Sequence, residues 1–265
     1  MEKRILTPKE SYEAMLTAAE TKAALPLGRM LVSAMLAGAF IALAGVGSTW
    51  ASVLVENLSL RRFLAGCVFP AGLALVVFTG TELFTGNNLM FMARLERLIT
   101  TAAMLRNWCA VWLGNFIGAV LVAVAVVYGG VFEGQEAVLV TAAAGKIMPF
   151  AEGFFKGVLC NVLVCLGVYM AAAGRDAAGK VTALFFPVAI FVMAGYEHCV
   201  ANMYYFTAGL LARDIYAGEA PAAWEVLSLS AIFMKNLIAV TIGNILGGAG
   251  VLGAGLWYIY GKGQK

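Results

Sequence analysis

The only histidine of the chain, His198, directly follows a carboxylate, Glu197, in the middle of a long apolar stretch. Each of these side chains would lose hydration worth several kcal/mol there unless it faced a polar cavity or a partner. Ionisable residues in an apolar segment of this kind therefore indicate a functional site. The alternative is a structural role, in which Glu197 stabilises a broken helix and His198 is hydrogen-bonded inside a bundle.

A second polar stretch, residues 80–88, interrupts an earlier apolar run. It places the carboxylate of Glu82, the hydroxyl of Thr85 and the amide of Asn87 among apolar side chains, and apolar sequence resumes at Leu89. Irregular backbone at membrane depth is tolerated only where it is buried in protein or lines a cavity. We therefore predict a discontinuous helix here and another at the His198 stretch.

The two polar stretches repeat one pattern. Asn87 follows Glu82 by five positions, and Asn202 follows Glu197 by five positions. Two further pairs recur at one spacing of seven, namely Asn107 with Gly114-Asn115 and Asn236 with Gly243-Asn244. The repeated unit contains three apolar runs, and an odd number of spans turns the second copy upside down. Such inverted repeats place broken helices and the binding site near the bilayer midplane.

The elements that hold these residues follow from composition. Of the 265 residues, 62% are hydrophobic and 12% are charged, which is typical of an integral membrane protein with room for about six spans. We expect an all-α membrane protein of six transmembrane helices arranged as two inverted three-helix repeats, with helices 2 and 5 broken. The expected spans cover about residues 27–50, 63–80, 108–130, 149–173, 181 onward and 230–260.

The segment before the first span is expected to be an amphipathic cytoplasmic helix within residues 1–25. Thr7 and Glu10 have the spacing of a capping box, and Pro8 suits the first helical position. The apolar face of this helix consists of Tyr12, Met15, Leu16 and Ala19. Residues 26–261 then form the transmembrane domain, and residues 262–265 form a short cytoplasmic tail.

The orientation follows from the distribution of Lys and Arg. With both termini on one side, that side holds twelve basic residues near the spans and the other side holds four. Cytoplasmic loops carry the excess of Lys and Arg, so both termini are expected in the cytoplasm. Within the fourth span, Glu152 precedes Lys156 by four positions, which favours an ion pair along a helix.

The chemistry of the two breaks favours a small anion. Half-helix N-termini near the bilayer centre attract negative charge, and Thr85 and His198 add hydrogen-bond donors. A metal ion or a haem needs several protein ligands, so we expect no metal and no other cofactor. The net charge of +3 is small and scattered, which predicts no nucleic-acid partner. Four apolar residues could form dry constrictions or could simply pack: Phe69, Leu73, Leu83 and Phe191.

Five stretches carry the most specific pattern in the sequence. They are Glu82-Leu83-Phe84-Thr85-Gly86-Asn87, Gly114-Asn115-Phe116-Ile117-Gly118, Asn161-Val162-Leu163-Val164-Cys165-Leu166, Gly195-Tyr196-Glu197-His198-Cys199-Val200-Ala201-Asn202-Met203 and Gly243-Asn244-Ile245-Leu246-Gly247-Gly248. Together they resemble the formate/nitrite transporter family of small-anion channels, over about residues 27–260. The resemblance implies an aquaporin-like protomer and a homopentamer in the lipid bilayer, in which each protomer has its own pore.

The resemblance also implies roles for individual residues. His198 corresponds to the family's central histidine, and Thr85 to the threonine that hydrogen-bonds near it. The outer constriction corresponds to Phe69 and Phe191, the inner one to Leu73 and Leu83, and the outer vestibule lysine to Lys146. The supporting polar residues are Glu82, Asn87, Glu197, Asn202, Asn115, Asn161 and Asn244, the last three satisfying the broken backbone. Glu197 is expected to orient His198 or to hold backbone donors of the broken helix, ahead of direct contact with the substrate.

The implied function is passage of a small monovalent anion across the cytoplasmic (inner) membrane, with formate ranked first, nitrite second and hydrosulfide third. Some formate channels carry Asp at the position of Glu82, which leaves the choice of anion open. A charged anion crosses apolar constrictions only at high cost, so proton transfer at His198 would let it pass as the neutral acid. In the competing interpretation, His198 remains protonated as a fixed cation.

Three other classes fit less well. An aquaporin-like channel for neutral solutes would normally carry two Asn-Pro-Ala turns, and none of the six prolines follows an asparagine. A haem-bearing membrane enzyme would need more than one histidine for bis-histidine ligation, and no HExxH or GxSxG pattern occurs, so we expect no enzyme. A non-transporting membrane subunit would leave the paired breaks unexplained.

Overall fold

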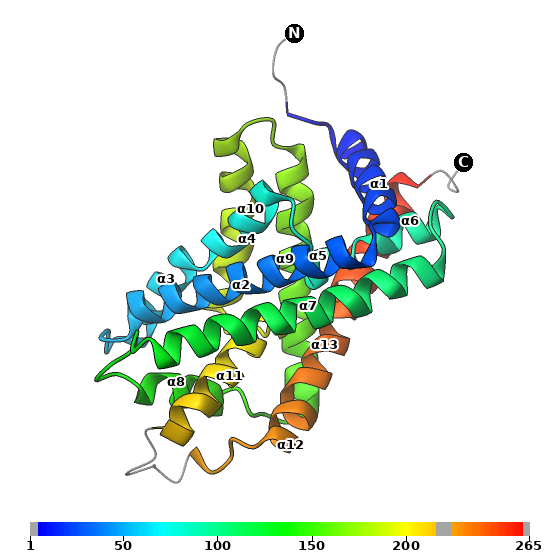
Figure 1. The fold of residues 1–265 in the computed structure, drawn as a ribbon. Coiled ribbons are helices and arrows are strands. Elements are labelled where there is room, and N and C mark those ends of the chain that lie inside the picture. Colours follow the sequence, from blue (N-terminus) through cyan, green and yellow to red (C-terminus); the bar gives the residue numbers. More distant parts are fainter. Residues whose placement is uncertain (1–4, 216–223, 262–265) are drawn as a thin grey trace.

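The computed structural model describes residues 5–215 and 224–261, and every regular element within these ranges is a helix (Figure 1). The helices are α1 (Pro8–Ala24), α2 (Leu27–Ser52), α3 (Leu58–Val68), α4 (Pro70–Thr79), α5 (Phe84–Asn87), α6 (Met90–Leu95), α7 (Thr101–Tyr128), α8 (Ala137–Ala144), α9 (Phe150–Ala173), α10 (Ala177–Met193), α11 (Cys199–Ile215), α12 (Leu229–Ile232), η3 (Phe233–Leu237), α13 (Ile238–Ile245), η4 (Leu246–Gly253) and α14 (Ala254–Tyr260). The elements η3 and η4 are π-helical stretches of the last long helical segment.

The same packing arrangement occurs in both halves of the chain. In the first half, α2 contacts α3 and α4 and packs along α7 (Figure 1). In the second half, α9 contacts α10 and packs along α13 and η4. α2 and α9 therefore occupy corresponding places, each as the first long helix of its half.

Two helical segments stop and restart at corresponding points. α4 ends at Thr79 and α5 begins at Phe84, whereas α10 ends at Met193 and α11 begins at Cys199. A glycine with positive φ follows each first part: Gly80 has φ 65° and Gly195 has φ 70°. Side chains other than glycine rarely adopt this left-handed conformation, so these two glycines allow the chain to leave the helix.

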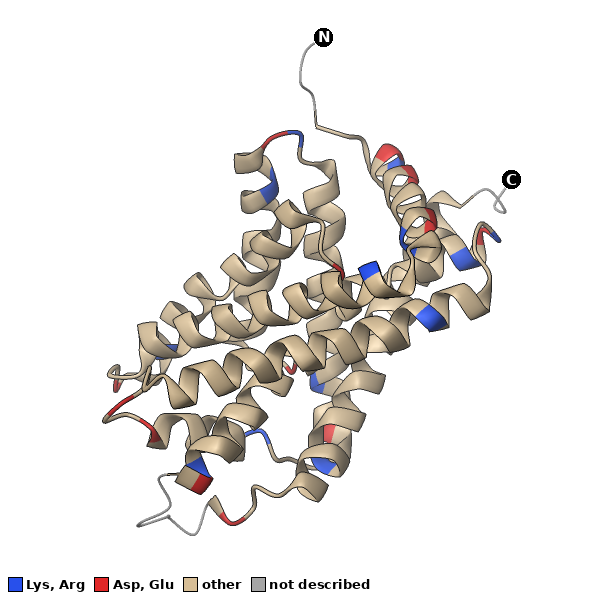
Figure 2. Ribbon diagram, in the orientation of Figure 1, with Lys and Arg blue, Asp and Glu red and all other residues tan. Residues whose placement is uncertain are grey.

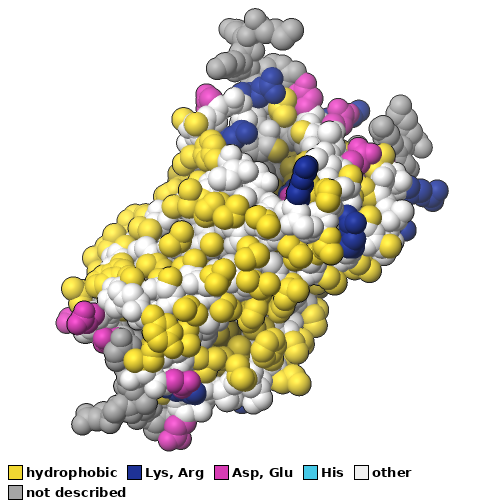
Figure 3. All heavy atoms as spheres, viewed as in Figure 1, with side chains coloured by type: hydrophobic (Ala, Val, Ile, Leu, Met, Phe, Trp, Pro, Cys, Tyr) yellow, Lys and Arg dark blue, Asp and Glu magenta, His cyan; other side chains and the backbone are white. Residues whose placement is uncertain are grey.

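Five helical segments of the described residues are long and apolar enough to cross a membrane: Leu27–Ser52, Leu58–Thr79, Thr101–Tyr128, Phe150–Ala173 and Leu229–Tyr260. α10 is apolar but shorter. Figure 3 shows a broad band of hydrophobic side chains across the middle of the molecule, and Figure 2 shows charged residues gathered mostly toward the ends. A broad exposed band of apolar side chains is expected where helices contact lipid.

α1 lies against the end of the bundle where the last helix finishes. The predicted capping box is confirmed, since Thr7 caps the helix and the Glu10 carboxylate receives the Thr7 N–H at 2.8 Å. The predicted apolar face is buried, and Tyr12 contacts Tyr260 of α14 with ring centroids 6.1 Å apart. The described parts of both termini therefore lie at one end of the molecule (Figure 1).

The third span differs from its prediction. The sequence predicts a span over residues 108–130, whereas α7 begins seven residues earlier, at Thr101. Arg106 and Asn107 lie inside this helix because both have partners. Arg106 donates to two backbone carbonyls at the end of α1, and Asn107 donates to the Glu82 carboxylate. The predicted pair in α9 is confirmed, with Lys156 Nζ 2.7 Å from Glu152 Oε1.

Candidate functional site

The two helix restarts bring Thr85 and His198 together. Thr85 Oγ1 lies 2.8 Å from Nε2 of His198, and both side chains are buried. The backbone N–H of Ala201 donates to the other ring nitrogen, Nδ1, at 3.1 Å. A nitrogen that accepts a hydrogen bond carries no proton, so the neutral ring carries its proton on Nε2 and donates it to Thr85 Oγ1.

This tautomer leaves the hydroxyl proton of Thr85 available. Its oxygen accepts from His198, and within the described residues the hydroxyl has no second acceptor. The Thr85 carbonyl is fixed separately by α9, where Asn161 Nδ2 and Cys165 Sγ both donate to it at 3.2 Å. The site therefore offers one O–H donor, the Thr85 hydroxyl, whose orientation is held by the hydrogen bond from His198.

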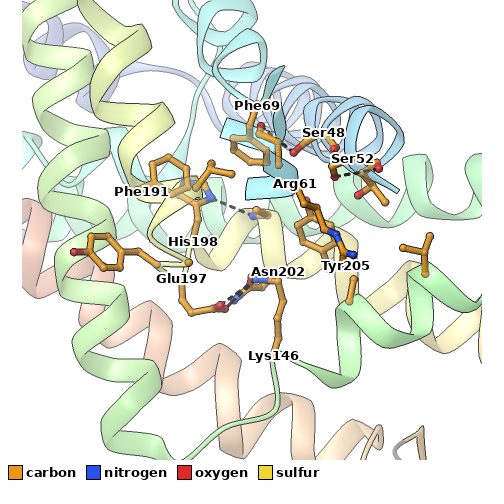
Figure 4. Close-up of a pocket in the computed structure, with 18 of the residues that line it drawn as sticks. Ser48, Ser52, Arg61, Phe69, Lys146, Phe191, Glu197, His198, Asn202 and Tyr205 are labelled. Atoms are coloured by element: carbon orange, nitrogen blue, oxygen red, sulfur yellow. Dashed lines mark hydrogen bonds and ion pairs between the residues drawn. The ribbon is translucent and has the colours of Figure 1, made fainter. Parts of the chain in front are cut away.

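Two phenylalanines lie directly beside the imidazole. Phe191 stacks on His198 with ring centroids 5.9 Å apart, and Phe69 meets Phe191 edge to face at 5.7 Å. All three residues line a cavity of about 340 Å³ that also contains Lys146 and that we name the outer cavity. Figure 4 shows Phe69, Phe191 and His198 adjacent to one another in this cavity. Phe69 and Phe191 therefore form an aromatic pair in the wall of the outer cavity, next to the imidazole of His198.

A second cavity, of about 370 Å³, approaches from the end of the molecule that carries α1. We name it the inner cavity, and it is lined by Lys22, Glu82 and Leu83, among others. Neither Thr85 nor Leu73 lines either cavity, and both are buried. Thr85 and Leu73 therefore lie in a buried layer between the two cavities, and His198 lies in the wall of the outer cavity.

The carboxylate of Glu82 organises the first break. It receives Asn87 Nδ2 at 2.7 Å and Asn107 Nδ2 at 3.2 Å, and Lys22 Nζ of α1 lies 2.6 Å from its other oxygen. Asn107 also donates to the backbone carbonyl of Lys22. The buried negative charge is thereby paired and hydrogen-bonded, as burial of a carboxylate requires.

The carboxylate of Glu197 organises the second break in the same way. It receives Asn202 Nδ2 at 2.6 Å and Asn236 Nδ2 at 3.2 Å, and Lys146 Nζ lies 3.1 Å away. Asn236 also donates to the backbone carbonyl of Lys146. Figure 4 shows the Glu197 side chain directed toward Lys146 and Asn202, and no hydrogen bond joins it to His198.

Two buried asparagines satisfy the irregular backbone. Asn115 accepts from Phe84 N–H and donates to the Glu82 carbonyl, at 2.9 Å in each case. Asn244 accepts from Cys199 N–H at 2.9 Å and donates to the Glu197 carbonyl at 3.0 Å. The backbone groups that each interrupted helix leaves unpaired thus find side-chain partners.

Sequence reasoning did not assign every member of these networks. The repeated pattern includes Asn107 and Asn236 but predicts no place for them at the site, although their fixed spacing from Asn115 and Asn244 is a usable signal. Lys22 cannot be predicted in the same way, because it lies in α1, outside the expected transmembrane domain and 60 positions from Glu82. Within the described residues, no cluster of His, Cys, Asp and Glu could hold a metal ion.

Known proteins resemble this chain in both sequence and fold. Residues 9–258 match the family model of the formate/nitrite transporter. A probable formate transporter of Methanothermobacter thermautotrophicus is 37% identical, with 97% of each chain covered. A solved ion channel of the FNT family superposes with a TM-score of 0.83 at 32% identity, covering 94% of this chain and 98% of its own. A pentameric formate channel solved with formate bound gives a TM-score of 0.75 at 31% identity, covering 88% of this chain and 97% of its own. This chain is therefore a member of the formate/nitrite transporter family.

Proposed function

We propose that the protein is a channel that passes formate across the cytoplasmic membrane, through the route that joins the outer cavity, the Thr85–His198 pair and the inner cavity. The observation that carries this proposal is the free O–H donor of Thr85, held by His198 between two cavities. An anion such as formate has an oxygen that can accept this hydrogen bond. Nitrite and hydrosulfide rank second and third as permeant anions.

The proposed architecture has six spans in two inverted repeats, with the second and fifth spans interrupted and both termini in the cytoplasm. It is supported by the matching networks around Glu82 and Glu197 and by the positive φ of Gly80 and Gly195. We also propose a homopentamer with one pore in each protomer. Support comes from the similar solved structure, which is a pentameric formate channel.

The hydrogen bond from Ala201 argues against a fixed positive charge on His198. A doubly protonated ring would point its Nδ1–H at the Ala201 N–H, so two donors would meet. In the proposed site the imidazole is therefore neutral, with its proton on Nε2 directed at Thr85 Oγ1. The proton that accompanies formate therefore crosses with the substrate, and His198 holds the Thr85 hydroxyl in its donating orientation.

The proposal predicts how flux depends on pH. Formate crosses the layer between Phe69, Leu73 and Leu83 as the neutral acid, because an unpaired charge is costly in apolar surroundings. The neutral fraction grows with proton concentration, so flux should rise as pH falls. The rise comes from the substrate, so it should persist in any variant that keeps a donor at the centre.

The test is formate flux into proteoliposomes between about pH 5 and 8, beside nitrite, hydrosulfide and glycerol as the neutral solute. Wild type should pass formate best and glycerol poorly. His198→Phe removes both ring nitrogens and should abolish flux, whereas His198→Asn keeps an amide donor and should retain part of it with the same pH trend. Normal formate flux in His198→Phe would refute the central site, and preferential glycerol flux would favour a neutral-solute channel.

A further inference from the structure

Each cavity contains a lysine whose charge is already compensated. In the outer cavity, Lys146 pairs with Glu197, and in the inner cavity Lys22 pairs with Glu82. These pairs are held by asparagines that serve the helix breaks. Because each pair is neutral overall, it contributes little net attraction for an anion that approaches from outside the cavity.

Each cavity is also lined by a second cation, to which the described part of the chain supplies no carboxylate partner. Arg61 lines the outer cavity and Lys180 lines the inner cavity. Among the ion pairs of residues 5–215 and 224–261, none involves either side chain. With the lysine–glutamate pairs neutral, Arg61 and Lys180 each leave their cavity with a net positive charge.

Arg61 is held in place without losing its charge. Its Nε donates to the Val55 carbonyl at 2.7 Å, and its Nη2 donates to the Glu56 carbonyl at 3.5 Å. Backbone carbonyls orient a guanidinium but do not neutralise it, and its remaining N–H groups stay available. Figure 4 shows Arg61 among the side chains that line the outer cavity, on the side of Ser52 and Tyr205.

The two cations occupy the same helical position in the two halves. Arg61 is the fourth residue after Asn57, the N-cap of α3, and Lys180 is the fourth residue after Asp176, the N-cap of α10. α3 and α10 are the helices that lead toward the two breaks. The Asp176 carboxylate is engaged by the Gly179 N–H at 2.7 Å and makes no ion pair with Lys180.

We propose that Arg61 and Lys180 are the anion-capture residues of the outer and inner cavities. This assignment rests on the proposed anion conduction. A net charge inside a cavity with low-dielectric walls concentrates counter-ions there and accelerates their association. Arg61 and Lys180 therefore raise the local concentration of formate at the two ends of the pore, whereas Lys146 and Lys22 stabilise the breaks.

The test compares formate uptake as a function of concentration for Arg61→Gln and Lys180→Gln in proteoliposomes at low and high salt. Each change should raise the half-saturating formate concentration by about two- to tenfold at low salt, with the maximal flux unchanged. The difference should shrink at high salt, because mobile ions screen the charge. Arg61→Lys and Lys180→Arg keep the charge and should restore wild-type values.

The matched controls are Arg62→Gln and Arg175→Gln, which remove an exposed positive charge next to each site without touching either cavity. If Arg61→Gln and Lys180→Gln behave like these controls while wild type conducts formate, the capture assignment is wrong and the channel proposal stands. A wild-type protein that conducts no formate overturns both. A lower maximal flux that Arg61→Lys does not rescue indicates a structural role and also contradicts the assignment.

Discussion

Thr85 and His198 are 113 positions apart in the chain, yet Oγ1 of the first lies 2.8 Å from Nε2 of the second. Thr85 belongs to the short helix after the first break, and His198 immediately precedes the helix after the second. Their contact therefore depends on both halves of the chain and joins the two breaks at one point. A change at either residue tests this junction directly.

Thr85→Val tests the hydroxyl at the centre. Valine keeps the shape of threonine but removes the acceptor for His198 Nε2–H, and leaving a buried donor unpaired costs about 1–3 kcal/mol. We expect a lower thermal midpoint and strongly reduced formate flux. Thr85→Ser is the matched control, since it keeps the hydroxyl and should conduct. Equal flux in Thr85→Val and wild type would mean that the hydroxyl does not contact the permeant species.

Glu197→Gln tests the buried ion pair of the second break. Removing the negative charge leaves Lys146 without its carboxylate, beside the amides of Asn202 and Asn236. Breaking a fully buried pair in this way costs about 3–5 kcal/mol, and the cost here should lie toward the lower end because Lys146 is 19% exposed. Thermal unfolding in detergent should show that Glu197→Gln is clearly less stable than wild type. Adding Lys146→Met should recover part of that loss, because it removes the orphaned charge.

Glu152→Gln is the control for that experiment. The Glu152–Lys156 pair has a similar distance, 2.7 Å, but both side chains are substantially exposed. Exposed pairs of this kind contribute about 0.3–0.5 kcal/mol. If both glutamine variants lose the same stability, the buried network around Glu197 has no special role.

Gly195→Ala tests the backbone at the second break. No atom lies within 4 Å of an added Cβ, so the effect comes from the positive φ alone. The left-handed conformation costs a non-glycine residue about 1–2 kcal/mol. Gly28→Ala, also in open space but inside α2, should be neutral or stabilising. Unfolding midpoints of the two variants that move together would contradict this explanation.

Ionisation of Tyr12 should make the packing of α1 against the helical bundle depend on pH. Burial, together with a hydrogen bond to the Glu96 carboxylate, holds the pKa of the Tyr12 phenol above its ordinary value of about 10. A raised folded-state pKa stabilises the protein fully below the unfolded pKa, and this contribution is lost as pH rises above it. The stability difference between wild type and Tyr12→Phe should therefore be constant near neutral pH and should fall above about pH 10.

The measurement for Tyr12 is protection of α1 from limited proteolysis at each pH. Tyr12→Phe cannot ionise, so its protection should change less than that of wild type over the alkaline range. Tyr258→Phe removes an exposed phenol near the same end and serves as the control. A wild-type profile that matches Tyr12→Phe throughout would show that this phenol does not contribute to docking.

Much of the fold could be predicted because the signals are local. The start of α1 follows from the capping box of Thr7 and Glu10, and the helix ends at Gly80 and Gly195 follow from polar stretches in apolar runs. The early start of α7 could not be predicted in this way. Arg106 is tolerated there only because distant carbonyls at the end of α1 accept its hydrogen bonds.

The candidate site was predictable to the extent that the repeat encodes it. Glu82, Asn87 and their counterparts recur at one spacing, so a common role was visible in the sequence. Lys22 and Lys146 have no common spacing to their glutamates, and only the folded chain shows that they correspond. Sequence spacing likewise could not show that Glu197 forms its ion pair with Lys146, or that His198 forms its hydrogen bond with Thr85 and not with Glu197.

The similarity of the networks around Glu82 and Glu197 has a consequence for the direction of transport. In the proposed channel, a permeant species that arrives from either face would meet the same types of feature: a cation, a lysine–glutamate pair and apolar side chains around the centre. Because the same types of feature line both halves of the proposed route, nothing in it favours transport in one direction. In the proposed channel, net movement of formate is therefore set by the gradients of formate and protons, and it reverses when those gradients reverse.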